Sequence, residues 1–221
     1  KTVGRRLNTF LGYVTNGLYE NYTDVEESPT STLGNIAISP GDIKYVDQPD
    51  ANGNYDGRIT SDDRVEIGDP WIPEIVYGFG PSMRWKNWDF SFFFQGQTNV
   101  SLIMENFEPF GERSARGVLA WIADDYWSPD YPNVNAKHPR LTRLTNNHNM
   151  QVSTYWLRDA SFLKLKNVEL GYSYKKARFY ISGSNLLTIS PFKHWDPEVG
   201  TGAGMQYPTQ RIFNLGIQMS F

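Results

Sequence analysis

Five stretches of the chain alternate apolar residues with small or polar ones. They cover residues 75–85, 88–97, 167–174, 177–187 and 211–221. From Phe213 to the end of the last stretch, every second residue is apolar: Phe213, Leu215, Ile217, Met219 and Phe221. Successive side chains of a β-strand point to opposite faces, so each stretch predicts a strand with one apolar face. Each is close to the roughly 9–11 residues that a tilted membrane strand needs.

Two environments produce such strands. One is a soluble sheet with one face on a core, and the other is an outer-membrane barrel with lipid outside and a wet lumen inside. Arg84, Asp89, Glu169 and Arg178 all fall on the face opposite the apolar one, where Phe93 breaks the alternation and Val76 and Tyr180 also lie. Because a basic side chain on a lipid-facing surface costs about 2–4 kcal/mol at mid-bilayer, this segregation favours the barrel.

The connections between the predicted strands differ greatly in length. Lys86-Asn87 and Lys175-Lys176 are short turns, whereas residues 100–155 and 187–210 are long connections. Compact soluble domains rarely contain loops of this length, but outer-membrane barrels combine short periplasmic turns with long extracellular loops. The pattern predicts an all-β fold with an acidic extracellular loop at 47–69 and a long one at 100–155, in which a helix begins at Ser114.

The composition narrows the classes of function. The net charge of −3 offers no broad basic field, so we expect no nucleic-acid partner. Because the chain contains no Cys, it has neither disulfides nor thiolate metal ligands. The chain begins with Lys1 and shows no signal peptide, and we therefore expect it to be part of a longer protein.

Several phrases in a fixed order carry a family resemblance. They are "DDRVEIGDPWIPEIVYGFG", "WDFSFFFQG", "YWSPDYPN", "YWLRDASFLKLKNVELGYSY", "ISGSNLLT" and "WDPEVG". Together they resemble the C-terminal third or quarter of SusC/RagA-like TonB-linked outer-membrane transporters, over nearly the whole chain. The most specific piece is residues 156–168.

The resemblance implies a fold and a function. Residues 1–221 would be the C-terminal strands and long extracellular loops of a 22-stranded transmembrane β-barrel in the bacterial outer membrane, whose plug and N-terminal strands are not in this chain. Such proteins import nutrients, usually oligosaccharides or peptides, and are not enzymes. The implied partners are a SusD-like surface lipoprotein, the TonB complex through the missing N-terminal part, the barrel assembly machinery, and lipid with lipopolysaccharide.

The resemblance also gives a role to the last strand. Phe221, together with alternating aromatics such as Phe213, would form the signal that the assembly machinery recognises. The alternative is an ordinary lipid-facing strand that ends at this residue.

One loop resembles a calcium-binding EF-hand loop. In "NGNYDGRITSDD", Asn52, Asn54, Asp56 and Asp63 take places one, three, five and twelve, and a Gly takes place six. No cofactor is required, and calcium is an optional ligand. The alternative is a loop that holds itself together through Asx turns.

No catalytic arrangement emerges from the sequence. The three His residues lack ligand spacing, and no nucleophile, base and orienting group occur together. Aromatic residues in the outer loops (Trp71, Trp127, Trp195, Tyr207) are able to stack on sugars, but loop packing explains them equally well, and the substrate-binding residues stay unknown. The rival interpretations are a soluble β-sandwich carbohydrate-binding module and an accessory domain of a secreted hydrolase.

Overall fold

The computed structural model describes residues 4–105, 118–204 and 206–220. The chain forms two compact units, each built from two separate segments of the sequence. Unit 1 comprises residues 1–68 and 103–157, and unit 2 comprises residues 69–102 and 158–221.

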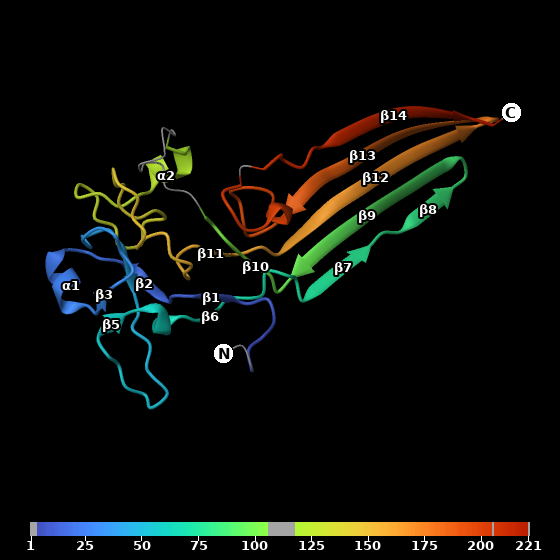
Figure 1. Cartoon of the computed structure of the whole chain (residues 1–221). Helices are drawn as coiled ribbons and strands as arrows, with labels where there is room; N and C mark the ends of the chain where they lie inside the picture. The colour runs from blue at the N-terminus through green and yellow to red at the C-terminus, as the bar shows by residue number, and fades with distance from the viewer. Residues whose placement is uncertain (1–3, 106–117, 205, 221) are drawn as a thin grey trace. The chain divides into compact units, whose positions relative to one another are not determined.

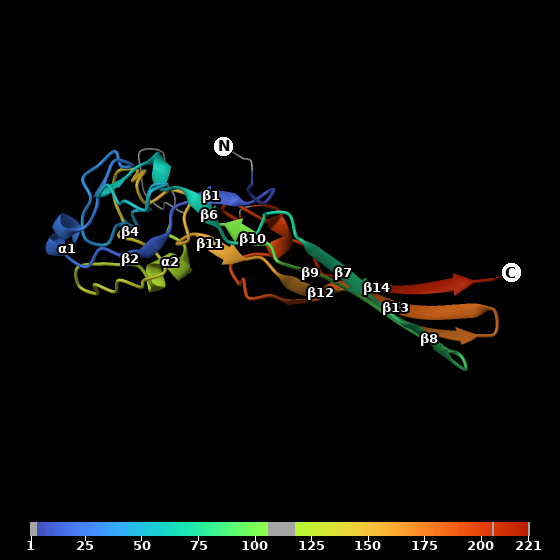
Figure 2. The same cartoon turned by 90° about the horizontal axis from the view of Figure 1, so that it is seen from below.

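Unit 2 is built around one antiparallel sheet of six strands. The strands are β7 (Ile75–Phe79), β8 (Ser82–Trp85), β9 (Trp88–Thr98), β12 (Phe162–Tyr174), β13 (Ala177–Ile189) and β14 (Ile212–Met219). Their order is β14-β13-β12-β9-β7, and β8 also pairs with β9 (Figure 1). Seen from below, the sheet is a single twisted layer (Figure 2). The all-β prediction is confirmed, and each of the five alternating stretches lies in this sheet.

The stretch 75–85 forms two strands where the sequence pattern predicted one. The break falls at Gly80-Pro81, because proline has no N–H with which to continue the ladder. The register continues across the break, from Phe79 opposite Phe94 to Ser82 opposite Ser91. The two faces of the sheet are therefore preserved.

Both predicted short turns are confirmed. Lys86 and Lys175 each occupy the first position of a two-residue turn with positive φ, at 53° and 52°. Positive φ at this position matches the right-handed twist of a tight hairpin, although it is uncommon for a lysine. The ammonium of Lys86 lies 5.0 Å from the ring centre of Trp85, and that of Lys175 lies 5.3 Å from that of Tyr174.

The pairing register places the predicted faces on opposite sides of the sheet. One apolar row crosses five strands as Met83, Phe90, Leu170, Ile181 and Leu215. The adjacent polar row contains Ser82, Ser91, Glu169, Ser182 and Asn214. Residues that face each other across a strand pair point to the same side, so the alternation within each strand becomes two uniform surfaces.

A bulge in β12 explains why its first part was not predicted. The register shifts between Leu165 and Asn167, which leaves Lys166 as the extra residue opposite β9. A bulge changes the parity of a strand. Leu163 and Leu165 before it therefore share a face with Val168 and Leu170 after it, although the sequence does not alternate continuously.

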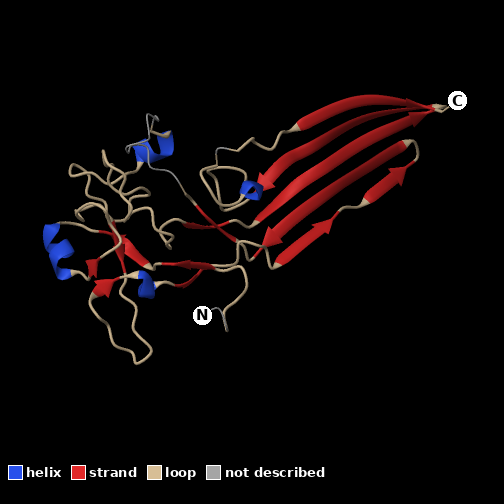
Figure 3. Cartoon of the chain, viewed as in Figure 1, coloured by secondary structure: helices blue, strands red, loops and turns tan. Residues whose placement is uncertain are grey.

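Unit 1 consists mainly of loops tied together by short strand pairs (Figure 3). β1 (Phe10–Gly12) pairs with β6 (Val65–Ile67), β2 (Thr15–Leu18) with β4 (Ile43–Tyr45), and β3 (Thr30–Ser31) with β5 (Arg58–Ile59). A further two-stranded sheet, in which β10 (Ser101–Ile103) pairs with β11 (Leu157–Asp159), lies mostly in unit 2. Fully buried side chains of unit 1 include Tyr13, Tyr19, Ile43, Tyr45, Ile59 and Ile122.

The helical segments are short. They are α1 (Tyr22–Glu27), α2 (Ala120–Asp124) and the 3-10 turns η1 (Ser61–Asp63) and η2 (Pro197–Val199). The predicted start of a helix at Ser114 lies outside the described residues, and Leu119 is the N-cap of α2. Across residues 4–105, 118–204 and 206–220, no helix has the length and apolar character to cross a membrane.

Candidate functional site

The apolar face of the six-stranded sheet is exposed. On β14, Leu215 is 85% exposed and Phe213 is 70% exposed, and other members of this face such as Trp85 and Ile181 are exposed as well. Such a large contiguous apolar surface needs an apolar covering. This face is the first candidate functional surface.

The opposite face carries a group of charged side chains that pair with one another. The guanidinium of Arg178 donates to Asp89, with Nε 3.0 Å from Oδ2, and to Glu169 at 2.5 Å. These groups lie above Gly171, where an added Cβ would be 2.5–2.6 Å from the Asp89 and Arg178 side chains. The sequence predicted that these charges share one face, and the structure shows that Arg178 pairs with both carboxylates there.

Phe93 is an aromatic exception on this polar face. Its ring covers two glycines of the neighbouring segment, since a Cβ on Gly78 would come within 2.8 Å of the ring and a Cβ on Gly80 within 3.0 Å. The glycines make room for the ring, and Phe93 is thereby packed against the sheet.

A cluster of four charged residues fastens the segment after β13 to β12. Lys164, only 1% exposed, donates to Asp196 at 2.6 Å and to Glu198 at 2.5 Å, and Lys166 donates to Glu198 at 2.6 Å. Burial alone would raise the pKa of Asp196 and Glu198, but these bonds outweigh it and lower both. The sequence analysis missed this Lys164 cluster, although the spacings K-x-K and D-x-E in two of the quoted phrases were a usable signal.

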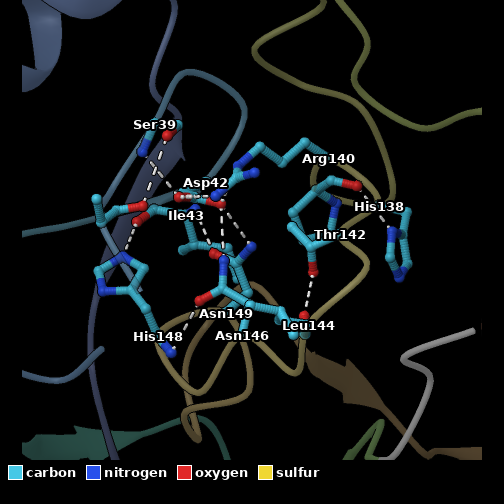
Figure 4. A network of polar contacts seen from close by, with 12 residues as sticks. Ser39, Asp42, Ile43, His138, Arg140, Thr142, Leu144, Asn146, His148 and Asn149 are labelled. Carbon is cyan, nitrogen blue, oxygen red and sulfur yellow. Dashed lines mark hydrogen bonds and ion pairs between the residues drawn. The ribbon is translucent and has the colours of Figure 1, made fainter. Parts of the chain in front are cut away.

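A buried carboxylate organises the polar interior of unit 1 (Figure 4). Asp42 is fully buried. Its Oδ1 accepts hydrogen bonds from Nε of Arg140 at 2.7 Å and from the amides of Asn146 and Asn149, each at 2.9 Å. Its Oδ2 accepts from the backbone of Ser39 at 2.9 Å. Five donors, counting a second Arg140 bond at 3.1 Å, satisfy this charge, so it stabilises the unit.

His148 lies beside this network and is structural. Its Nε2 is 2.7 Å from the carbonyl of Ile43, which only accepts, so Nε2 carries the proton and Nδ1 accepts from the Ser31 hydroxyl at 3.1 Å. The hydroxyl of Tyr45 donates to the His148 carbonyl at 2.6 Å. Burial lowers the pKa of His148.

The loop aromatics divide into two groups. Trp71 and Tyr207 are exposed, whereas Trp127 is buried and Trp195 is half-buried against Phe192, at 4.5 Å between ring centres. Packing therefore accounts for the second group.

The residues of the predicted calcium loop take part in separate local hydrogen bonds. Asp50, which is outside the set of four predicted ligands, accepts from the backbones of Asn52 and Asn54 at 2.7 and 2.9 Å. Asp56 accepts from the backbone of Arg58, and Asp63, the last residue of η1, is buried. The described part of the chain contains no group of three or more His, Cys, Asp or Glu side chains able to hold a metal ion as it stands. Calcium binding by the four predicted ligands stays a prediction.

Of the two residues predicted as an assembly signal, Phe221 lies outside the described residues. Phe213 belongs to the exposed apolar face, opposite Gly183 of β13. Their role in assembly stays a prediction.

Curated proteins that are similar to the chain share one kind of name. Curated proteins that match 96–99% of the chain are named TonB-dependent receptors, and none of these names is that of an enzyme. They confirm the resemblance to SusC/RagA-like TonB-linked transporters. No protein-family model matches the chain.

The individual relatives are distant and much longer. TonB-dependent receptor P3 of Formosa agariphila is 28% identical over an alignment 241 residues long, gaps included, which covers 99% of this chain and 22% of that protein. TonB-dependent receptor SusC of Bacteroides thetaiotaomicron is 27% identical over 223 residues, which cover 96% and 20%. The chain thus spans about a fifth of the length of these relatives.

Solved structures agree with the fold. One structure of the RagAB peptide transporter is matched with a TM-score of 0.69 and 25% identity, over 96% of this chain and 23% of that one. The RagAB peptide importer in its open-open state is matched with a TM-score of 0.67 and 23% identity, over 96% of this chain and 22% of that one.

Proposed function

We propose that this chain forms part of the barrel wall and the outer loops of a TonB-dependent importer in the bacterial outer membrane. The observation that carries the proposal is the exposed apolar face of the six-stranded sheet, with its charged side chains confined to the other face. A lipid bilayer covers the first face, and a wet lumen solvates the second.

The sheet edges support this reading. Within the described residues, β14 has a neighbour on one side only, and so do β7 and β8. Open edges are not tolerated in hydrocarbon, where each unpaired backbone group costs several kcal/mol. Further strands therefore pair with both edges, and the family resemblance suggests a barrel of 22 strands. Unit 1, which contains residues 47–68 and 103–157, forms the extracellular part.

The substrate and the partners follow only by analogy. We expect an oligosaccharide or a peptide, the RagAB relatives being peptide importers by name. We further expect a SusD-like lipoprotein on the outer side, coupling to TonB through the part of the protein that precedes this chain, and no catalytic activity.

Cysteine labelling of β13 in whole cells tests the proposal. The chain carries no native Cys, so introduced thiols are the only ones in this region. In outer membranes, Ser182→Cys should react with a small water-soluble maleimide, while Ile181→Cys should resist it. When Ile181→Cys is instead labelled with a fluorophore, a lipid-attached quencher should reduce the fluorescence.

Two outcomes contradict the proposal. One is equal labelling of the adjacent positions by the water-soluble reagent. The other is recovery of the intact protein in the soluble fraction without detergent, which the carbohydrate-binding module would give.

A further inference from the structure

Asp47 in unit 1 has an unsatisfied buried oxygen. The residue is 8% exposed. Its Oδ2 accepts from the backbone of Gly57 at 2.8 Å, whereas Oδ1 is buried without a hydrogen-bond partner. A buried charged oxygen without a donor is costly, so this oxygen calls for a proton or a cation.

A second buried carboxylate lies against it. Asp63 is 4% exposed, and its Oδ1 accepts from the backbone of Gln48, the residue that follows Asp47, at 2.8 Å. Its Oδ2 accepts from the backbone of Thr60 at 2.7 Å. The pKa of Asp47 is raised, first by its burial and then by the negative charges of Asp63 and Asp56.

The fold explains why the sequence pointed to different ligands. Residues 50–54 close on themselves, because the backbone of Asp50 donates to the Asn54 carbonyl at 2.9 Å and the backbone of Gly53 donates to the Asp50 carbonyl at 3.0 Å. Asn52 is exposed on this small turn. Asp47, just before the turn, instead reaches the backbone N–H of Gly57, which has a positive φ of 73°.

We propose that the carboxylates of Asp47 and Asp63 bind a calcium ion, with Asp47 in the place that the sequence pattern gave to Asn52. In an EF-hand loop, the carboxylates at the first and twelfth places coordinate the ion from the two ends of the loop. Since no third His, Cys, Asp or Glu side chain among the described residues completes a metal-binding group here, water and main-chain oxygens supply the other ligands. A site of this kind is weak, with a dissociation constant on the order of 10⁻⁴–10⁻³ M.

Calorimetric titration of the intact protein with calcium tests the site. Asp47→Asn keeps the size of the side chain and an acceptor for Gly57 but removes the charge, so the affinity should fall by more than about tenfold. The matched control is Asn54→Ala, which removes a ligand of the sequence-based assignment and should leave the affinity within about twofold, since its side chain lies outside the proposed site.

Trypsin cleavage after the exposed Arg58 gives a second measurement. Calcium should slow this cleavage in the wild type but not in Asp47→Asn. With a chelator, Asp47→Asn should be cleaved no faster than the wild type, because the substitution relieves repulsion between the two carboxylates. A purely structural role of Asp47 predicts faster cleavage of the variant in both conditions.

If Asp47→Asn does not assemble, hydrogen exchange of the wild type decides. Calcium should protect the amides of Gln48, Gly57 and Thr60, and leave those of Asn52 and Asn54 unchanged. No heat at millimolar calcium, full binding by Asp47→Asn, or protection confined to residues 50–54 would each overturn the proposal.

Discussion

At the residue scale, two buried aspartates of unit 1 have contrasting surroundings. Asp42 is surrounded by donors, and Asp47 has one oxygen without any. Neither environment was visible in the sequence, because the partners of Asp42 lie about 100 residues away. The sequence identified the acidic loop, but the spacing of its residues did not show which carboxylates the fold would bury.

Removing the Asp42 carboxylate should destabilise unit 1 strongly. Asp42→Ala leaves the Arg140 guanidinium and two amides without their acceptor, and breaking such a pair costs about 3–5 kcal/mol. Hydrogen exchange of the Ser39 and Ile43 amides in the intact protein measures this as a lower free energy of local opening. The control is Asp24→Ala, whose partly exposed pair with Lys44 should contribute no more than about 1 kcal/mol. Equal effects of the two variants would contradict the assigned role.

Acidification should destabilise unit 1 through His148. Its pKa is lowered in the folded state, so the unfolded state binds the proton more tightly. The stability that neutral His148 gives to the folded unit is therefore complete above about pH 6.5. It is lost as the pH falls through that value toward the pKa of His148 in the folded state. Exchange of the amides near His148 between pH 7.5 and pH 5 reports this loss. His148→Gln should reduce the pH dependence, whereas substitution of the exposed His194 should leave it unchanged.

At the element scale, the strands were predictable and their irregularities were not. The sequence identified the strand faces because hydrophobic alternation is a local signal. It missed Phe162–Lys166, since the bulge reverses the parity, and it joined β7 to β8, since Pro81 stops the ladder without shifting the register. A bulge is defined by how a strand pairs with its neighbour, and a single stretch of sequence does not show that pairing.

The Lys164 cluster should hold the segment of residues 190–200 in place. Lys164→Met keeps the apolar stem but leaves Asp196 without its cation, which should lower the free energy of opening of this segment by about 1–3 kcal/mol. Limited proteolysis and hydrogen exchange of residues 190–200 measure the effect. Lys193→Met, an exposed lysine of the same segment, is the control.

The same cluster has a pH signature. Because the folded pKa of Asp196 and Glu198 is lowered, their contribution is present above about pH 4.3 and is lost as the pH falls below it. Acid-induced loosening of residues 190–200 that is unchanged in Lys164→Met would contradict this account.

At the scale of the whole molecule, the proposed barrel wall turns one surface of the sheet to lipid and the other to water. Leu215→Arg places a charge in the middle row of the apolar face, and we expect a cost of about 2–4 kcal/mol and less folded protein in outer membranes. Asn214→Arg, one residue away on the polar face, should be tolerated. The measurement is the amount of folded protein in the outer-membrane fraction, and equal amounts of the two variants would contradict the proposed sidedness.

The two hairpin turns have a consequence for the position of the sheet. Each places an ammonium group over an aromatic ring, and both rings lie at the same end of the sheet. In the proposed barrel, these pairs lie at the level of the lipid headgroups, where a ring and a cation are both favourable and neither is favourable a few ångströms deeper. In the proposed barrel, the two turns therefore anchor this end of the sheet at the headgroup level and oppose its movement along the membrane normal.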